Sequence, residues 1–170
     1  MFRALAISLF ALLSPVFLSC EKASEVIIPD TPNGGQYENG ESNGDDNNIA
    51  MPDEIKITVS GKSLPVKIED NEATKALVAS LREASITYEA DDYGGFEKVG
   101  SLGRSLPTSN SQITTQAGDV ILYNGNQLVL FYGSNSWSYT RIGRMEYGTL
   151  DELKSFLKAG QGKISVTMSL

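Results

Sequence analysis

Two apolar runs near the middle of the chain form its clearest pattern, Val120–Tyr123 and Gln127–Tyr132, with Asn124-Gly125 between them. An Asn-Gly pair between β-favouring runs predicts a hairpin, because a type I′ turn needs positive φ at both central residues. A two-residue turn of this kind pairs Tyr123 with Asn126. Both runs are apolar at nearly every position, so we expect both faces of the hairpin to contact protein.

Apolar and polar residues alternate along 55–60, 64–69 and 163–170, which predicts three half-buried strands. The shorter stretches 85–89 and 141–147 predict two more strands. Glycines interrupt Asp91–Pro107, which we expect to form turns and close backbone approaches. Gly133–Tyr139 is expected to be a loop that holds the only Trp of the chain, and we place any binding there.

Two segments show the spacing of amphipathic helices, near 71–83 and 150–159. Asp70 or Asn71 is the N-cap of the first helix, and Thr149 with Glu152 forms a capping box at the second. About eight short strands with two helices indicate a mainly β protein, either a sandwich or a closed antiparallel barrel. In a barrel, the two short helices are placed to cover the open ends.

Residues 1–20 have the features of a secretory signal: Arg3 precedes an apolar run from Ala4 to Leu18, which is too short to assign as a membrane span. The run ends in Ser19-Cys20, which resembles a bacterial lipobox whose Cys is lipidated and becomes the mature N-terminus. The alternative is a plain cleaved signal with an incidental Cys. Cys20 is the only Cys, so no intrachain disulfide forms.

Residues 21–53 predict a disordered acidic tether, because Gly, Asn, Asp, Glu and Ser offer almost nothing to bury. Such a tether spans roughly 30 Å on average. Residues 21–54 carry nine acidic residues and one Lys, whereas residues 55–170 carry twelve of each sign. The net charge of −7 therefore belongs to the tether, and the domain predicted at 54–170 is balanced. Without a basic stripe, we expect no nucleic-acid partner.

The side-chain inventory excludes most catalytic chemistry. The chain has no His, which removes Ser-His-Asp and Cys-His nucleophile systems and His-ligated zinc, and it has no phosphate-binding loop. Asp91-Asp92 with Glu97 is conceivable as a carboxylate pair for glycoside hydrolysis, but we interpret Asp91-Asp92 as a solvated acidic turn before Tyr93. We assign no catalytic residue, no metal ligand and no cofactor.

An aromatic and polar group remains after these exclusions. Aromatic rings with one or two guanidinium groups suit a concave site that stacks a flat or peptide-like ligand. The alternative is packing, with Phe96, Tyr132 and Trp137 filling the ends of the barrel. The candidate ligand-binding residues are Tyr93, Phe96, Arg104, Gln127, Tyr132, Asn135, Trp137, Tyr139 and Arg141.

Two segments carry a resemblance: DYGGFEKVGSLGRSLP at 92–107, and ITTQAGDVILYNGNQLVLFYGSNSWSYTRIGRM at 113–145. They resemble the bacterial cyclophilin-like domain family, small relatives of the cyclophilins, and the similarity extends over roughly Ile55 to Leu170. The resemblance implies a closed eight-stranded barrel with helices over its ends. Cyclophilin enzymes place an Arg beside an apolar proline pocket lined by Phe, Trp and His. This chain lacks the His and the order of the enzyme motif, so no catalytic residue carries over.

Together these observations predict a lipid-anchored lipoprotein of the bacterial cell envelope, exported from the cytoplasm and attached to a membrane through Cys20. Its cyclophilin-like domain is expected to be a non-enzymatic module that binds a peptide segment, a small molecule or an envelope protein. The alternative is a weak peptidyl-prolyl cis-trans isomerase, because rotation about an X–Pro bond needs no proton transfer and no nucleophile.

Overall fold

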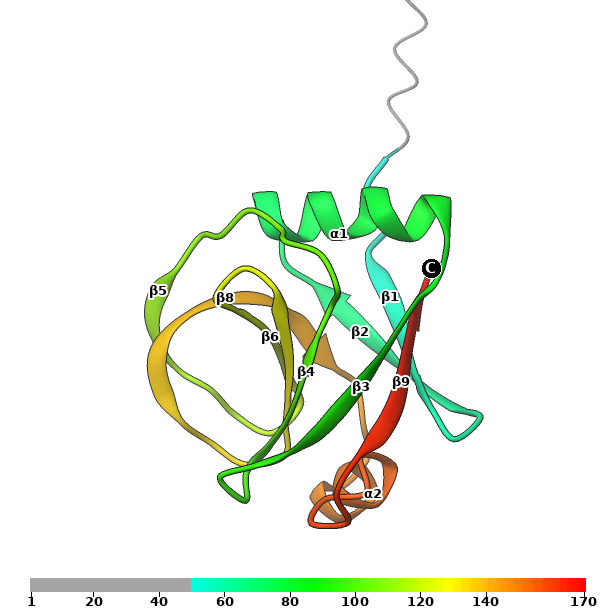
Figure 1. The fold of residues 1–170 in the computed structure, drawn as a ribbon, viewed down its shortest axis with the longest axis vertical. Helices are drawn as coiled ribbons and strands as arrows, with labels where there is room; N and C mark the ends of the chain where they lie inside the picture. The colour runs from blue at the N-terminus through cyan, green and yellow to red at the C-terminus, as the bar shows by residue number, and fades with distance from the viewer. Residues whose placement is uncertain (1–49) are drawn as a thin grey trace, which may run out of the picture. The chain divides into compact units, whose positions relative to one another are not determined.

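The computed structural model describes residues 50–170, in which nine strands and two helices form (Figure 1). The predicted signal peptide, Cys20 and most of the tether lie outside the described residues. In chain order the elements are β1 (Glu54–Val59), β2 (Lys62–Ile68), α1 (Glu72–Glu83), β3 (Ile86–Tyr93), β4 (Glu97–Ser101), β5 (Ser111–Thr114), β6 (Asp119–Tyr123), β7 (Gln127–Phe131), β8 (Ser136–Met145), α2 (Leu150–Phe156) and β9 (Ile164–Ser169).

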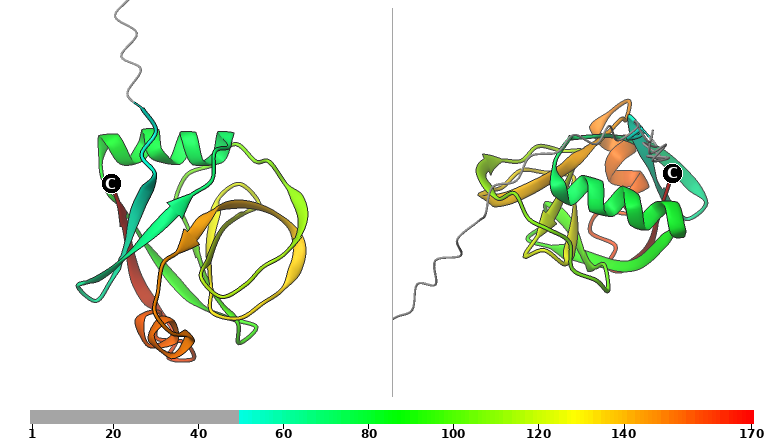
Figure 2. Two further views of the ribbon diagram at one scale, coloured as in Figure 1. Left: turned by 180° about the vertical axis from the view of Figure 1, so that it is seen from behind. Right: turned by 90° about the horizontal axis from the view of Figure 1, so that it is seen from above.

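Eight of the strands close into an antiparallel barrel. Their order is β2-β1-β9-β3-β4-β7-β6-β8, and β8 pairs back onto β2 through Val66 with Met145 and Ile68 with Gly143. The ninth strand, β5, pairs with β8 alone. Helix α1 lies across one end of the barrel and α2 lies at the opposite end (Figures 1 and 2). The predicted fold class, a closed cyclophilin-like barrel with two short helices, is confirmed.

The central hairpin packs on both of its faces, as its pattern predicts. Leu122 and Leu128 belong to the large core inside the barrel, together with the buried side of α1. Ile121, Val129 and Phe131 point the other way and form a second, smaller core with Tyr139 on the outside of the barrel wall. The outer core is the base on which the candidate site is built.

The turn of this hairpin departs from the expected register by one residue. Asn124 and Gly125 both have positive φ, at 50° and 72°, as predicted. Tyr123, however, pairs with Gln127 rather than with Asn126. Asn126 is an extra turn residue whose carbonyl accepts a hydrogen bond of 2.9 Å from the Leu102 N–H. The connection after β4 therefore fixes the longer turn.

Two predicted loops are strands in the structure. β4 lies within the glycine-rich stretch Asp91–Pro107, and β8 begins at Ser136 instead of Arg141. Trp137 and Tyr139 are consequently strand residues that share one face of β8, because side chains two residues apart point the same way. The expectation of a binding loop at Gly133–Tyr139 is wrong for its second half.

The helix caps follow the sequence closely. Asn71 is the N-cap of α1, and its side chain accepts a hydrogen bond from the Thr74 N–H. The Thr149–Glu152 capping box is present at α2. Helix α2 ends at Phe156, shorter than the expected 150–159, because the chain turns at Lys158, where φ is 48°. Within residues 50–170, no helix is long and apolar enough to cross a membrane.

Candidate functional site

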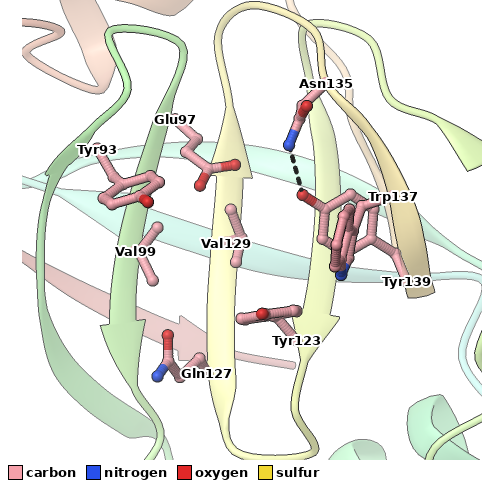
Figure 3. Close-up of a pocket in the computed structure, with 9 residues that line it drawn as sticks. All are labelled: Tyr93, Glu97, Val99, Tyr123, Gln127, Val129, Asn135, Trp137 and Tyr139. Atoms are coloured by element: carbon pink, nitrogen blue, oxygen red, sulfur yellow. Dashed lines mark hydrogen bonds between the residues drawn. The ribbon is translucent and has the colours of Figure 1, made fainter.

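A pocket of about 320 Å³ lies on the outer face of the barrel wall, above the smaller core (Figure 3). We call it the outer pocket. Strands β4, β7 and β6 form its floor, and β8 forms a wall. Its lining residues are Tyr93, Glu97, Val99, Tyr123, Gln127, Val129, Asn135, Trp137 and Tyr139.

Strand alternation and register place these side chains on one face. Val99 pairs with Val129 across β4 and β7, and Tyr123 pairs with Gln127 across β6 and β7. Residues at odd-numbered positions of these three strands therefore face the pocket, and their even-numbered neighbours face the barrel interior. Adding or removing one turn residue at Asn124–Asn126 would shift the register between β6 and β7 and turn the side chains of one strand to the opposite face.

Strand β8 becomes the wall because it leaves the plane of the floor. Its pairing with β6 shifts register between Val120 and Ile121, a β-bulge, and bulges bend a strand and increase its twist. Beyond this point β8 pairs with β5, with Trp137 opposite Ile113. The turn before β8 is fixed by Asn135, whose N–H donates to Thr115 Oγ1 at 2.9 Å. The wall is therefore held along its edge by the pairing of β8 with β5.

Aromatic rings stabilise the base of the pocket. The ring of Tyr139 packs edge-on against Phe131 and against Tyr123, with a centroid separation of 5.9 Å in each pair. The Asn135 Nδ2 donates to the Tyr139 hydroxyl oxygen at 2.9 Å (Figure 3). Such edge-to-face pairs stabilise beyond simple burial, so the position of Tyr139 is well defined. Trp137 and Tyr93, in contrast, are 55% and 66% exposed.

Glu97 is the unusual member of the lining. Its side chain is only 6% exposed, and its Oε2 has no hydrogen-bond partner. Burial raises the pKa of this carboxyl group from 4.5 to about 7. A buried polar atom without a partner is destabilising, since it loses the hydrogen bonds it would make in water. Glu97 is buried because β4 places it on the pocket side of the wall.

The expectation of a solvated acidic turn before Tyr93 is wrong for Asp92, which belongs to β3 and is paired inside the barrel. Its Oδ2 accepts from the fully buried Lys98 Nζ at 2.8 Å and from the Gly162 N–H at 2.8 Å, while Oδ1 accepts from the Tyr132 hydroxyl at 2.9 Å. Desolvation alone would raise the pKa of Asp92, but these hydrogen bonds and one from the Gly160 N–H hold it at about 2. This carboxylate is a structural ion-pair partner.

The structure separates the nine predicted ligand-binding residues into two groups. Five line the outer pocket: Tyr93, Gln127, Asn135, Trp137 and Tyr139. The others lie elsewhere. Phe96 stacks on Phe131 at the edge of the smaller core, and Tyr132 is buried with its hydroxyl on Asp92, so the packing interpretation holds for these two. Arg104 is exposed in the connection after β4 and does not line the pocket.

Arg141 has a structural partner that the sequence did not indicate. Its guanidinium lies 3.2 Å from the fully buried Asp119 and 3.5 Å from Glu69. Asp119 also accepts from Arg144 at 2.8 Å. The two arginines therefore neutralise a buried carboxylate at the start of β6, and Arg141 is not among the residues that line the pocket.

Four lining residues were missed by the sequence prediction: Glu97, Val99, Tyr123 and Val129. Recognising β4 as a strand would have indicated that Glu97 and Val99 face the same side, but the glycines around it suggested turns instead. Tyr123 and Val129 belong to the hairpin and were treated only as packing residues. Within residues 50–170, no group of three or more His, Cys, Asp or Glu side chains is placed to hold a metal ion.

The model of the cyclophilin-like family matches residues 57–169, nearly the whole of the described barrel. The chain belongs to this family. Among solved structures, this cyclophilin-like chain is similar to the solution structure of a hypothetical protein from Archaeoglobus fulgidus, at 17% identity and a TM-score of 0.48, covering 68% of this chain and 92% of the other.

It is also similar to McbB, solved in complex with tryptophan, at 11% identity and a TM-score of 0.47. That similarity covers 68% of this chain and 44% of McbB. The search of curated proteins returned no match. Any activity of this cyclophilin-like domain must therefore be argued from its own pocket.

Proposed function

We propose that the domain is a non-enzymatic binding module and that a small molecule, or a side chain presented by a peptide, enters the outer pocket. The observation that carries this proposal is Glu97, a buried carboxyl group whose Oε2 has no partner, in the same pocket as the exposed ring of Trp137. A ligand that contacts both groups would cover apolar surface and supply the missing partner.

The two kinds of aromatic residue in this region support binding over packing. Phe131 and Tyr139 are buried and make the ring contacts of the smaller core. Tyr93 and Trp137 line the same pocket but remain exposed for more than half of their surface. Exposed aromatic rings around a preformed hollow are typical of ligand sites, because they gain contact area when the ligand is bound.

The composition of the lining does not favour the isomerase alternative. Peptidyl-prolyl isomerisation by one guanidinium requires an Arg beside the bound proline, but the lining residues include no basic side chain. Arg141 is held by Asp119, and Arg104 lies in the connection after β4. We expect no acceleration of proline isomerisation at low temperature, where the uncatalysed step takes minutes. Acceleration lost in R104A or R141A would contradict the binding-module proposal.

Binding is tested with the full chain, a panel of small ligands and short peptides, and NMR or calorimetric titration. V99W fills the pocket and should abolish binding by any ligand that enters it. S155W is the matched control, because Ser155 lines a separate groove beside α2. If V99W and S155W bind every ligand equally well, the outer pocket is not the site.

We further propose that this domain is held at a membrane of the cell envelope by lipidation of Cys20, with residues 21–53 as a tether. The apolar run ending in Ser19-Cys20 supports this proposal. C20A should release the protein from the membrane fraction and remove the acyl label. Retention of C20A in that fraction, with no label on the parent, would contradict lipid anchoring.

A further inference from the structure

The charge of the outer pocket indicates which ligand chemistry it suits. Glu97 is the only acidic side chain in the lining, and no Lys or Arg accompanies it. The adjacent Lys98 points into the barrel and is paired with Asp92. Nothing in the described part of the chain therefore supplies a positive charge to the buried Glu97 Oε2.

The surrounding rings favour the same sign of charge. Tyr93, Tyr123, Trp137 and Tyr139 come from three strands, β3, β6 and β8, and line the pocket that holds Glu97. In Figure 3 the Glu97 carboxylate extends over β7, between Tyr93 on one side and the Asn135–Tyr139 pair on the other. The face of an aromatic ring is electron-rich and attracts cations. A carboxylate and several ring faces therefore act in the same direction.

The hydrogen-bond donors of the pocket are all neutral, so none supplies the positive charge that would favour an anion. The Asn135 amide nitrogen is occupied by the Tyr139 hydroxyl at 2.9 Å, and its Oδ1 accepts from the Ser136 N–H. Gln127 is then the remaining amide in the lining. A volume of about 320 Å³ accommodates a small amine or the end of a long side chain, at the lower limit of typical ligand pockets.

We propose that the outer pocket binds the cationic nitrogen of an organic ammonium group, with Glu97 as counter-ion and the aromatic rings as walls. The ammonium belongs either to a free amine or to a lysine side chain on a peptide. This inference rests on the proposed binding function and specifies its ligand class.

The protonation of Glu97 makes the proposal testable by the sign of a pH effect. The titratable groups that line the pocket with Glu97 from other elements are Tyr93, Tyr123 and Tyr139, and Tyr132 lies inside the barrel with its hydroxyl on Asp92. Burial raises the pKa of Tyr132 and Tyr139 above the ordinary value for tyrosine. Asp92, behind the wall, stays ionised because its pKa is held at about 2. Glu97 is thus the group expected to titrate near neutral pH.

The first experiment uses the full chain, with Trp137 fluorescence as reporter because it is the only Trp and it lines the pocket. Choline is titrated against 3,3-dimethylbutan-1-ol, a neutral molecule of the same shape. We expect choline to bind at least about tenfold more tightly at about pH 8, and its affinity to fall about tenfold by about pH 6 as Glu97 is protonated. Equal affinities for the two molecules would overturn the proposal.

Variants assign the effect to Glu97. E97Q keeps the shape of the side chain and should reduce choline affinity at least about tenfold and remove its pH dependence. D91N removes an exposed carboxylate of β3 that does not line the pocket, and it should bind choline as the parent does. Tighter binding of a neutral carbonyl ligand at low pH, retained in E97Q, would show instead that Glu97 acts as a protonated donor.

A second titration distinguishes the two sources of the ammonium. Nα-acetyl-lysine N-methylamide is compared with its norleucine analogue, which lacks the charge. A lysine derivative that exceeds choline in affinity assigns the pocket to a peptide ligand, and the reverse order assigns it to a free amine. Binding of neutral ligands alone overturns the cation proposal but leaves the binding module intact. If no ligand of any charge alters Trp137 fluorescence or NMR shifts in the pocket, both proposals fail.

Discussion

Glu97 and Lys98 are neighbours on β4, yet their environments are opposite. Lys98 points into the barrel, is fully buried, and donates to Asp92 and to the Gly162 carbonyl. Glu97 points outward into the pocket, is almost as buried, and has an oxygen with no partner. One step along a strand thus changes a charge from satisfied to unsatisfied.

The comparison shows how the barrel wall separates two uses of a buried charge. Inside, Asp92 connects β3 to Lys98 of β4, to Tyr132 after β7 and to Gly162 before β9, so the ion pair fixes four segments together. Outside, the protein leaves Glu97 without a partner in a hollow that opens to solvent. A structural charge is complete in the folded chain, whereas under the proposed function the charge of Glu97 is completed by a ligand.

Removing Asp92, the partner of the buried Lys98, should have the largest effect on stability. D92A removes the partner of Lys98 and leaves a buried ammonium group facing only the Gly162 carbonyl, so we expect a loss of about 3–5 kcal/mol in the free energy of unfolding. Urea denaturation measures this loss. D91A is the matched control at an exposed neighbour and should change stability by less than about 0.5 kcal/mol. A loss in D92A no larger than in D91A would remove the contrast between the two faces.

Glu97, the outer charge, should make the protein less stable as the pH rises, whereas the contribution of Asp92 is lost as the pH falls. The pKa of Glu97 is about 7 in the folded protein and 4.5 ordinarily, so between these values the folded chain holds a proton that the unfolded chain releases. The free energy of unfolding should therefore fall from about pH 4.5 to about pH 7, by at most about 1.4 kcal/mol per pH unit. E97Q should flatten this decline. Denaturant titrations of both proteins across this range provide the measurement.

Asp92 affects the stability of the fold in a different pH range. Its pKa is lowered to about 2 from 3.8, so the stability it contributes is present above about pH 4 and is lost as the pH falls toward 2. The two neighbouring sites together predict a stability maximum near pH 4 to 5. A decline toward pH 7 that persists unchanged in E97Q would assign the effect to another group.

The bond that orients Tyr139 should have a smaller effect. N135A removes the donor to the Tyr139 hydroxyl and also the acceptor of the Ser136 N–H, and we expect a loss of about 0.5–1.5 kcal/mol for each of these two hydrogen bonds. Thermal unfolding measures it, with S138A at an exposed position of β8, the strand of Tyr139, as control. If N135A and S138A unfold at the same temperature, the stability of the wall does not depend on the contact between Asn135 and Tyr139.

The smallest effect on stability is expected at Trp137. More than half of this ring is exposed, so W137A should change the free energy of unfolding by no more than about 0.5 kcal/mol. The same change should weaken ligand binding, measured by calorimetry, because the ring is part of the pocket wall. A large loss of stability in W137A would place this ring with the packing residues.

Local signals predicted the elements that local physics controls. The caps at Asn71 and Thr149 fixed both helix starts, and the Asn124-Gly125 pair fixed the turn conformation. β4 was missed because Gly100 reads as a turn residue. It is a strand residue at which a Cβ would meet the Glu89 carbonyl of β3, a requirement set by the neighbouring strand.

The composition of the site depends on contacts distant in sequence. Five pocket residues were selected as aromatic or polar side chains, but the facing of Glu97 follows from the register between β4 and β7. Arg141 was a reasonable candidate until its partner Asp119 was known, twenty-two residues away in the chain. The residue pattern of one strand does not show which of its charged side chains is neutralised by a residue on a different strand.

The way the barrel closes also determines when its folding can be completed. β1 lies between β2 and β9, with Val59 opposite Val166 and Lys56 opposite Ser169, so nearly the first and the last described residues share one ladder. During synthesis the chain emerges from its N-terminal end, and Ile164–Ser169 emerge after every other strand. Until then β1 and β3 each present an unpaired edge, which is a site for aggregation and for chaperone binding. The ring can therefore close only after nearly the whole of this domain has emerged.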